Sequence, residues 1–223
     1  MSSARKLTIV SGFFLVGVVA LAVYVFVWLS YNPETITPAT SVGSSGQLTT
    51  NLELATVGSI DFGTHPSWVA YLTRVDGKWV STTVWQVPAH SLIHVTLLEY
   101  DTQTGLRNPF MSQVRGTVGD VEYVNGKAVR YMNPNFPAHT FSIPELGVNV
   151  PLEGIPQSTY PGTISGNPHG EHQTITFSFR TGNAQTDHWQ CFVPCAAGYL
   201  FGQGGPMQTI GYMDGYLKVV NPK

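Results

Sequence analysis

The chain has 223 residues, a formal net charge of −2 and a charged fraction of 11%, well below the roughly 25% of average domains. Because acidic residues outnumber basic ones, the composition excludes a protein that binds nucleic acid through a basic face. The apolar fraction of 43% excludes wholesale disorder. Two cysteines are too few for a disulfide-dense scaffold or a four-cysteine zinc site.

The first segment, residues 1–31, is predicted to hold a single transmembrane helix. Residues 7–29 carry no charge, and these 23 residues, at about 1.5 Å each, span the roughly 30 Å hydrocarbon core of a bilayer. Trp28 lies near the end of this stretch, as interfacial aromatic residues do. The alternative is a cleaved signal peptide with its cleavage motif at residues 20–22, but the apolar region of a signal peptide has only about 7–15 residues.

The charges around this helix predict its orientation. Arg5 and Lys6 precede it, and no basic residue follows closely. The positive-inside rule then predicts a single-pass protein of the cell membrane, with the N-terminus in the cytoplasm and the remaining domain outside. Residues 32–50 are rich in Ser, Thr, Gly and Pro and are predicted to be a flexible linker. Residues 51–223 form the predicted extracytoplasmic domain.

This domain is predicted to be all-β, because no segment after residue 50 has a sustained helical period. Asp-Gly at residues 76–77 and Asn-Gly at residues 125–126 separate strand-forming residues, which predicts two hairpins. The predicted strands include residues 94–100, 174–179 and 217–220. Short strands with irregular turns predict an antiparallel sandwich or a Greek-key barrel, with residues 101–136 as a long excursion that contains one hairpin.

Three separated segments of the domain carry residues that bind copper well. They are residues 138–148, which include His139, residues 191–195, which begin and end with Cys191 and Cys195, and residues 213–219, which begin with Met213. Thiolate and thioether favour Cu(I), and imidazole accepts both oxidation states of copper. A mixed set of these ligands is typical of an electron-transfer site.

These segments resemble cytochrome c oxidase subunit II. His139 and the Pro-x-Leu-Gly sequence of residues 144–147 are similar to the segment of that family that holds its first histidine ligand. The three-residue spacer between Cys191 and Cys195 matches the dicysteine loop of the family, and Met213 lies where its methionine ligand does. The resemblance covers about residues 135–220. It implies a cupredoxin-like β-sandwich with one N-terminal transmembrane helix, and a dinuclear copper centre that passes electrons to haem in subunit I.

The chain also departs from the family pattern. Tyr199 stands where the family has its second histidine, four residues after the second cysteine, and Ile210 stands three residues before Met213. Pro151 replaces an acidic residue of the family. The loop between Cys195 and Met213 contains an inserted Gly-rich stretch, residues 202–207, that ends in a second candidate ligand, Met207.

Three states of the site are therefore open. The first is a modified copper site made of His139, Cys191, Cys195 and either Met213 or Met207, with a further histidine from elsewhere. His188, His90 and His94 are candidates for that histidine by residue type alone. The second is a metal-free domain with a Cys191–Cys195 disulfide, which the extracytoplasmic location favours. The third has two free thiols.

Three functions follow from this interpretation. The leading hypothesis is a subunit II-like component of a membrane haem–copper oxidase, with an integral subunit I-like partner and a redox protein or quinol as electron donor. In that hypothesis the chain transfers electrons, or is structural if copper is lost. The alternative is a stand-alone, membrane-tethered cupredoxin that binds or delivers copper. A cell-surface β-sandwich without a redox role is the third.

Overall fold

The computed structural model describes residues 3–24, 34–156, 163–164, 167–195 and 204–222. The chain divides into two units, residues 1–33 and residues 34–223. The first unit contains helix α1 (Ser3–Val23). Among the described residues, no helix combines the length and the apolar character needed to cross a membrane. Trp28 and the rest of the predicted membrane segment after residue 24 lie outside the described residues.

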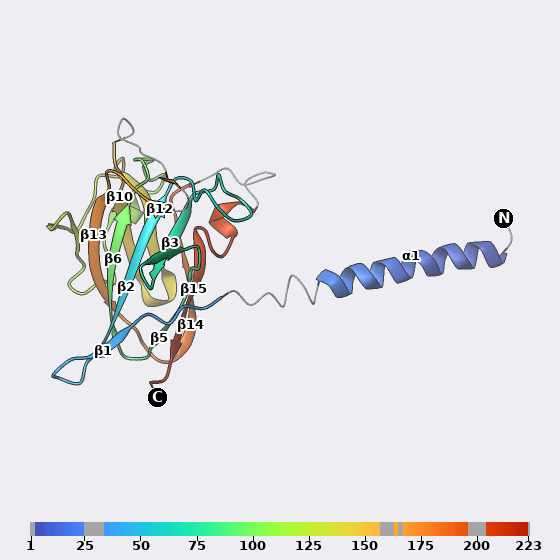
Figure 1. The fold of residues 1–223 in the computed structure, drawn as a ribbon, viewed down its shortest axis with the longest axis horizontal. Helices are drawn as coiled ribbons and strands as arrows, with labels where there is room; N and C mark the ends of the chain where they lie inside the picture. Colours follow the sequence, from blue (N-terminus) through green and yellow to red (C-terminus); the bar gives the residue numbers. More distant parts are fainter. Residues whose placement is uncertain (1–2, 25–33, 157–162, 165–166, 196–203, 223) are drawn as a thin grey trace. The chain divides into compact units, whose positions relative to one another are not determined.

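The second unit is built mainly from two β-sheets (Figure 1). The larger sheet has the order β4 (Lys78–Val80), β3 (Ala70–Val75), β2 (Leu48–Val57), β6 (Leu92–Glu99), β13 (Gln173–Arg180), β7 (Glu122–Val124) and β8 (Lys127–Val129), and β1 (Thr40–Val42) also pairs with β2. The smaller sheet has the order β10 (Val148–Glu153), β9 (Pro137–Ile143), β14 (Gln185–Gln190), β15 (Asp214–Val220) and β5 (Val84–Pro88). The remaining described elements are the pair β11 (Thr163–Ile164) and β12 (Asn167–Pro168) and the 3-10 helices η2 (Pro109–Ser112), η3 (Pro144–Leu146) and η6 (Pro206–Gln208).

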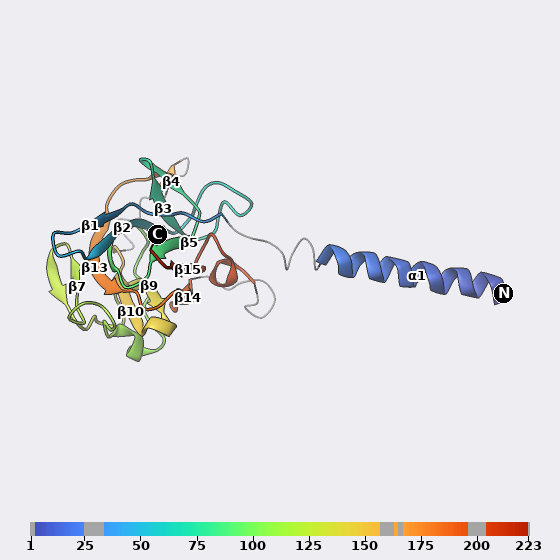
Figure 2. The same cartoon turned by 90° about the horizontal axis from the view of Figure 1, so that it is seen from below.

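The two sheets pack on each other around one apolar core, as the second view shows (Figure 2). The larger sheet contributes Leu54 and Leu97, and the smaller sheet contributes Phe141 and Leu217. Strands β6 and β13 alternate buried and partly exposed residues along their length. This is the pattern of strands whose one face covers a core. The prediction of an all-β domain is therefore confirmed.

Both predicted hairpins are present. β3 pairs with β4 across the Asp76-Gly77 turn, and β7 pairs with β8 across the Asn125-Gly126 turn. All four turn residues have positive φ, between 48° and 79°. Tight hairpin turns of this kind require positive φ at both central positions, which Gly, Asn and Asp adopt at low cost.

The sheets are not purely antiparallel, as a simple antiparallel sandwich would require. β2 pairs with β6 in parallel, and β15 pairs with β5 in parallel. Neighbours joined by a tight turn must be antiparallel, whereas strands far apart in sequence are free of that constraint. Between the two strands of each parallel pair, the chain forms other strands before it comes back alongside the first. Local sequence patterns do not reveal this pairing.

Part of the predicted linker, residues 32–50, is bonded to the domain. Ile36 donates its backbone N–H to Val84 O at 2.9 Å and accepts from Gln86 N at 2.8 Å. Strand β1 pairs with the start of β2. The β-branched residues of this stretch extend the sheet edges, and the compact second unit includes the chain from Glu34 onward.

Gly215 of β15 is the most tightly enclosed glycine of the described core. A Cβ atom there would collide with Thr83 O and with Trp189 Nε1, which are themselves hydrogen-bonded to each other at 2.9 Å. We expect Gly215→Ala to lower the free energy of unfolding by about 3 kcal/mol, because the backbone or the buried indole must move. Chemical denaturation measures this change.

Gly182→Ala is the matched control for this prediction. A Cβ atom at Gly182 would meet no heavy atom within 4 Å, so its free energy of unfolding should stay close to that of the wild type. Equal losses in the two variants would show that the close packing at Gly215 does not limit stability.

Candidate metal centre

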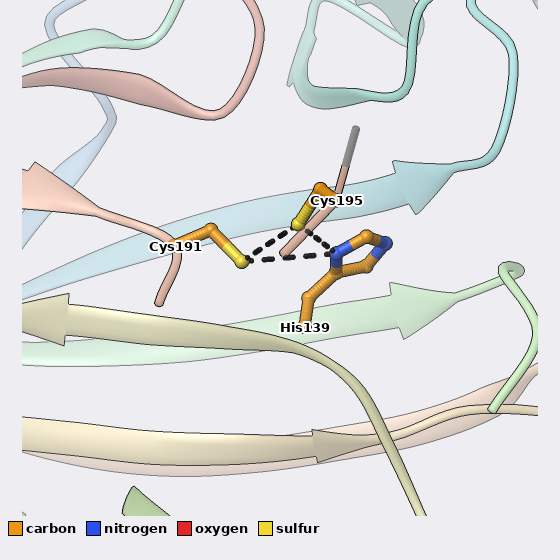
Figure 3. A group of neighbouring side chains, drawn as sticks. All are labelled: His139, Cys191 and Cys195. Carbon is orange, nitrogen blue, oxygen red and sulfur yellow. Dashed lines mark hydrogen bonds between the residues drawn. The ribbon is translucent and has the colours of Figure 1, made fainter. Parts of the chain in front are cut away.

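The structure brings His139, Cys191 and Cys195 together, and their ligand atoms lie within 4.8 Å of one another. His139 Nδ1 is 3.1 Å from Cys195 Sγ and 3.8 Å from Cys191 Sγ. The two sulfur atoms are 3.1 Å apart. Figure 3 shows the imidazole and both thiols directed toward a common point. His139 and Cys191 are buried, and Cys195 is partly exposed.

Elements of the smaller sheet position these three side chains. His139 lies on β9, of which all seven residues are buried. Cys191 follows the last residue of β14, and two contacts hold its loop against β9. Thr140 N donates to Cys191 Sγ at 3.4 Å, and Phe192 N donates to Thr140 Oγ1 at 2.8 Å. The cysteine loop is therefore fixed relative to the histidine.

Two acidic residues lie on the other side of the imidazole ring. His139 Nε2 is 3.1 Å from Asp101 Oδ2 and 4.0 Å from Glu99 Oε1. The backbone N–H of Asp101 also donates to Glu99 Oε1 at 2.8 Å, which holds the Glu99 carboxyl group beside Asp101. Glu99 is the last residue of β6 and Asp101 follows two residues later, so the end of this strand in the larger sheet supplies the acidic side of the site. The ring is held with Nε2–H toward Asp101 and Nδ1 toward the sulfur atoms.

Burial and neighbouring charges shift the acidity of the carboxyl groups in opposite directions. Burial raises the pKa of Glu99 from 4.5 to about 8, although the charge of His139 opposes this shift. Burial also disfavours the charge of Asp101, but its hydrogen bond with His139 and the charge of that imidazole outweigh burial and lower its pKa. At neutral pH Asp101 is therefore an anion, and Glu99 is largely neutral.

The thiols of the two cysteines also differ in pKa. Burial opposes a thiolate at Cys191, but hydrogen bonds from Cys195 and His139 outweigh it, so the pKa of Cys191 is well below its usual value. Burial and the adjacent Cys191 raise the pKa of Cys195 well above its usual value. The pair is thus a thiolate at Cys191 that accepts a hydrogen bond from the thiol of Cys195. A thiolate is the form of cysteine that binds metals.

His139 is stabilised as a cation in this environment. Burial lowers its pKa, but Glu99, Asp101 and Cys191 together overcome burial, and the pKa lies well above the usual value. The protonated ring donates from Nε2 to Asp101 and from Nδ1 to the sulfur atoms. Binding a metal at Nδ1 displaces that proton, so metal affinity depends on pH.

The donor set fits a soft metal ion. Two sulfur atoms and one imidazole nitrogen are the ligands that select Cu(I), and imidazole also accommodates Cu(II). The arrangement of Asp101 behind the imidazole is the one that commonly orients histidine ligands of metals and increases their basicity. The Cys-Cys-His cluster therefore fits a copper site.

Both predicted methionine ligands lie next to these segments. Met213 is buried, and its carbonyl oxygen accepts from Cys191 N at 3.1 Å. Met207 packs against the same core, and its carbonyl oxygen accepts from Gln190 Nε2 at 2.6 Å. Coordination by either sulfur atom stays a prediction.

The other histidine candidates have partners elsewhere. His188 is 2.6 Å from Asp214 Oδ1, and its side chain is 39% exposed. His94 Nδ1 is 3.0 Å from Ser178 Oγ, and His90 is exposed at a turn. The metal-binding group found among the described residues thus contains one imidazole, that of His139. Tyr199 lies outside the described residues.

The structure also shows whether the two cysteines are bonded to each other. Both are free thiols, so the structure contains no Cys191–Cys195 disulfide.

Sequence reasoning missed Glu99 and Asp101, although a signal for Glu99 was present. Along β6, residues 93, 95 and 97 are apolar and buried, and the same alternation places residue 99 on the buried face. A carboxyl group there is unusual, because buried carboxylates need a partner. That partner is His139, which only the packing of the two sheets reveals.

Comparisons with known proteins concern the fold. No protein-family model matches the chain, and no curated protein matches its sequence. Among solved structures, it is similar to a multicopper oxidase, with 12% identity over 85% of this chain and 48% of that chain and a TM-score of 0.40. The chain thus spans about half the length of that oxidase.

Two further solved structures are similar to it. One is rusticyanin from Thiobacillus ferrooxidans, with 14% identity over 86% of this chain and 85% of that chain and a TM-score of 0.32. The other belongs to a heme-copper terminal oxidase dimer, with 12% identity over 98% of this chain and 100% of that chain and a TM-score of 0.32. The structural neighbours therefore include a cupredoxin and a haem–copper oxidase.

Proposed function

We propose that this chain is a subunit II-like component of a membrane haem–copper terminal oxidase. A cupredoxin domain would hold copper at His139, Cys191 and Cys195 and transfer electrons to an integral subunit I-like partner, in which oxygen is reduced. The observation that carries this proposal is the cluster of these three residues, two of them buried, with ligand atoms within 4.8 Å of one another. Copper, when bound there, supplies one-electron transfer.

The chain's own residues prepare this site. Cys191 offers a thiolate, which the Thr140 N–H and the Cys195 thiol stabilise by hydrogen bonds. Asp101 orients the imidazole of His139, so that Nδ1 faces the sulfur atoms. Burial of His139 and Cys191 excludes water, which lowers the reorganisation that accompanies a change of charge. Met213 and Met207 are the candidates for a further sulfur ligand.

The membrane setting is part of the same proposal. The uncharged stretch of residues 7–29 would anchor the chain, and Arg5 and Lys6 would keep the N-terminus in the cytoplasm. The domain would then lie outside the cell membrane and receive electrons from a redox protein or from quinol. If the domain carried no copper, it would act as a structural subunit of the complex.

One observation favours a second function, that of a stand-alone, membrane-tethered cupredoxin that binds or delivers copper. The cluster has two sulfur donors for one imidazole. Sulfur-rich sets favour Cu(I), the oxidation state in which copper is usually passed between proteins. A delivery protein would bind Cu(I) without stable oxidation to Cu(II).

The copper site is tested by metal titration of the purified full-length chain. We expect bound copper and a thiolate-to-Cu(II) charge-transfer absorption that disappears in Cys191→Ser. His188→Gln is the matched control, because His188 pairs with Asp214 outside the cluster, and it should bind copper as the wild type does. A chain that shows no thiolate-to-copper absorption with either Cu(I) or Cu(II), and that has no free thiols, would contradict the copper site.

The oxidase assignment needs a separate experiment. The chain is purified from native membranes in mild detergent, and the haem spectrum of the preparation is recorded. Haem in fixed stoichiometry supports a subunit of an oxidase. Copper without haem would support the copper-binding alternative, and haem with a copper content that Cys191→Ser leaves unchanged would support the structural subunit.

A further inference from the structure

A cavity lies beside Phe192, in the loop that carries Cys191 and Cys195. This cavity of about 520 Å³ is lined by apolar side chains of Met111, Pro144, Val148 and Phe192, with Arg115 among them. This volume lies within the range of about 300–1,000 Å³ that is typical of sites for small molecules. Phe192 is 42% exposed, although it is a large aromatic residue. An exposed aromatic wall beside a cavity is suited to packing against a flat ligand.

Among the residues that the structure describes, Arg115 is the only charged one that lines this cavity. Its guanidinium lies 3.8 Å above the ring of Phe110, and Arg115 Nε is buried without a hydrogen-bond partner in the described part of the chain. None of the ion pairs among the described residues includes Arg115. A buried donor without an acceptor costs free energy, so this group favours an acceptor from outside the chain.

Two of the neutral polar residues of the cavity, Ser142 and Asn149, are already engaged. Asn149 Nδ2 donates to Met111 O at 2.9 Å and to Gln113 O at 2.8 Å. Asn149 Oδ1 accepts from Ser142 Oγ at 2.9 Å. Backbone hydrogen bonds in both directions between Arg115 and Asn149, each of 2.9 Å, hold the base of the arginine in place. The backbone of Arg115 is therefore fixed next to the cavity, and its guanidinium supplies a cationic donor there.

We propose that this cavity binds a small aromatic carboxylate. Its ring packs against Phe192 and the neighbouring apolar side chains, and its carboxylate accepts hydrogen bonds from Arg115. The planar guanidinium matches a carboxylate in shape and charge. The site goes beyond electron transfer and requires no metal. It touches the metal centre through Phe192, whose backbone is bonded to Thr140 beside Cys191.

Ligand-observed fluorine NMR on the full-length chain tests this proposal. The probe is para-trifluoromethylbenzoate, and the matched neutral probe is para-trifluoromethylbenzamide. We expect the benzoate to bind, and the benzamide to bind at least about tenfold more weakly, because hydrogen bonds to charged groups contribute more than neutral ones. Equal binding of the two probes, or binding of neither, would overturn the proposal.

Variants locate the site. Arg115→Gln should weaken benzoate binding by about tenfold or more, and Arg115→Lys should retain part of it, because Lys keeps the charge but loses the planar fork. Phe192→Ala should weaken both probes by removing the aromatic wall. Arg180→Gln is the matched control, since Arg180 is exposed and bonds to Gln47 away from this cavity. Benzoate binding that Arg115→Gln leaves unchanged would place the ligand elsewhere and refute the site.

Discussion

Replacing Asp101 by Asn is expected to weaken copper binding on the order of 10- to 100-fold, the loss that follows when a residue that orients a metal ligand is changed. Asp101 Oδ2 is 3.1 Å from His139 Nε2 and keeps that nitrogen protonated, so that Nδ1 is the atom that faces the thiols. Asn lacks the negative charge that increases the basicity of the ring. Competition with a Cu(I) chelator measures the affinity.

Loss of a buried carboxylate away from the copper site should not weaken copper binding in this way. Asp187→Asn is the matched control, because Asp187 is a buried carboxyl whose acidity depends on burial, Gln185 and Glu145, and not on the cluster. Its copper affinity should equal that of the wild type. Nitrogen NMR of His139 adds a readout without metal, in which Asp101→Asn should change the protonation of the two ring nitrogens. Unchanged affinity together with an unchanged ring spectrum would refute the role of Asp101.

Glu99→Gln is expected to remove the part of the fall in stability with rising pH that the raised pKa of Glu99 causes in the metal-free protein. Between pH 4.5 and about 8 the unfolded chain has lost the Glu99 proton, whereas the folded chain keeps it. Folding is therefore favoured at the acidic end and weakened toward the alkaline end. A pKa raised from 4.5 to about 8 corresponds to a loss on the order of 5 kcal/mol in the free energy of unfolding across this interval.

Gln is neutral at every pH and can still accept from Asp101 N, so the variant should match the wild type near pH 4.5 and exceed its stability near pH 8. Denaturant unfolding at a series of pH values, with a thiol reductant present, measures the two profiles. Glu171→Gln changes an exposed carboxyl and serves as control. Parallel profiles for wild type and Glu99→Gln would mean that Glu99 is not a neutral acid in the folded protein.

Glu122 provides an independent comparison. Burial and the neighbouring charge of Glu153 raise its pKa well above the usual value, and it lies on β7, in a different part of the larger sheet from Glu99. Glu122→Gln should also reduce the alkaline loss of stability, for the same physical reason. It should leave copper affinity unchanged, because Glu122 does not belong to the group formed by His139, Cys191 and Cys195. The stability and the copper affinity of this variant together distinguish the effect of burying a carboxyl group from a role in the metal centre.

Much of the architecture was predictable because it depends on local chemistry. Asp76-Gly77 and Asn125-Gly126 specify their hairpins through the positive φ that those turns demand. Period-two alternation identified β13. The grouping of His139 with Cys191 and Cys195 came from a resemblance in motif, and the structure places them together. The parallel pairs were not predictable, because a strand's own residues do not state which distant strand lies beside it.

The sequence by itself determined which residue types were available to the site and where the two hairpin turns and strands such as β13 would form, since turn conformation and burial periodicity act over a few neighbouring residues. Only the tertiary structure decided which residues meet. Asp101 lies 38 residues from His139, and Cys195 lies 56 residues beyond it. Their contacts depend on the pairing order of β9 and β14 and on the packing of β6 across the core. That packing also makes Glu99 a neutral acid and Cys191 a thiolate, because burial and neighbouring charge, which set both acidities, exist only once the two sheets have come together.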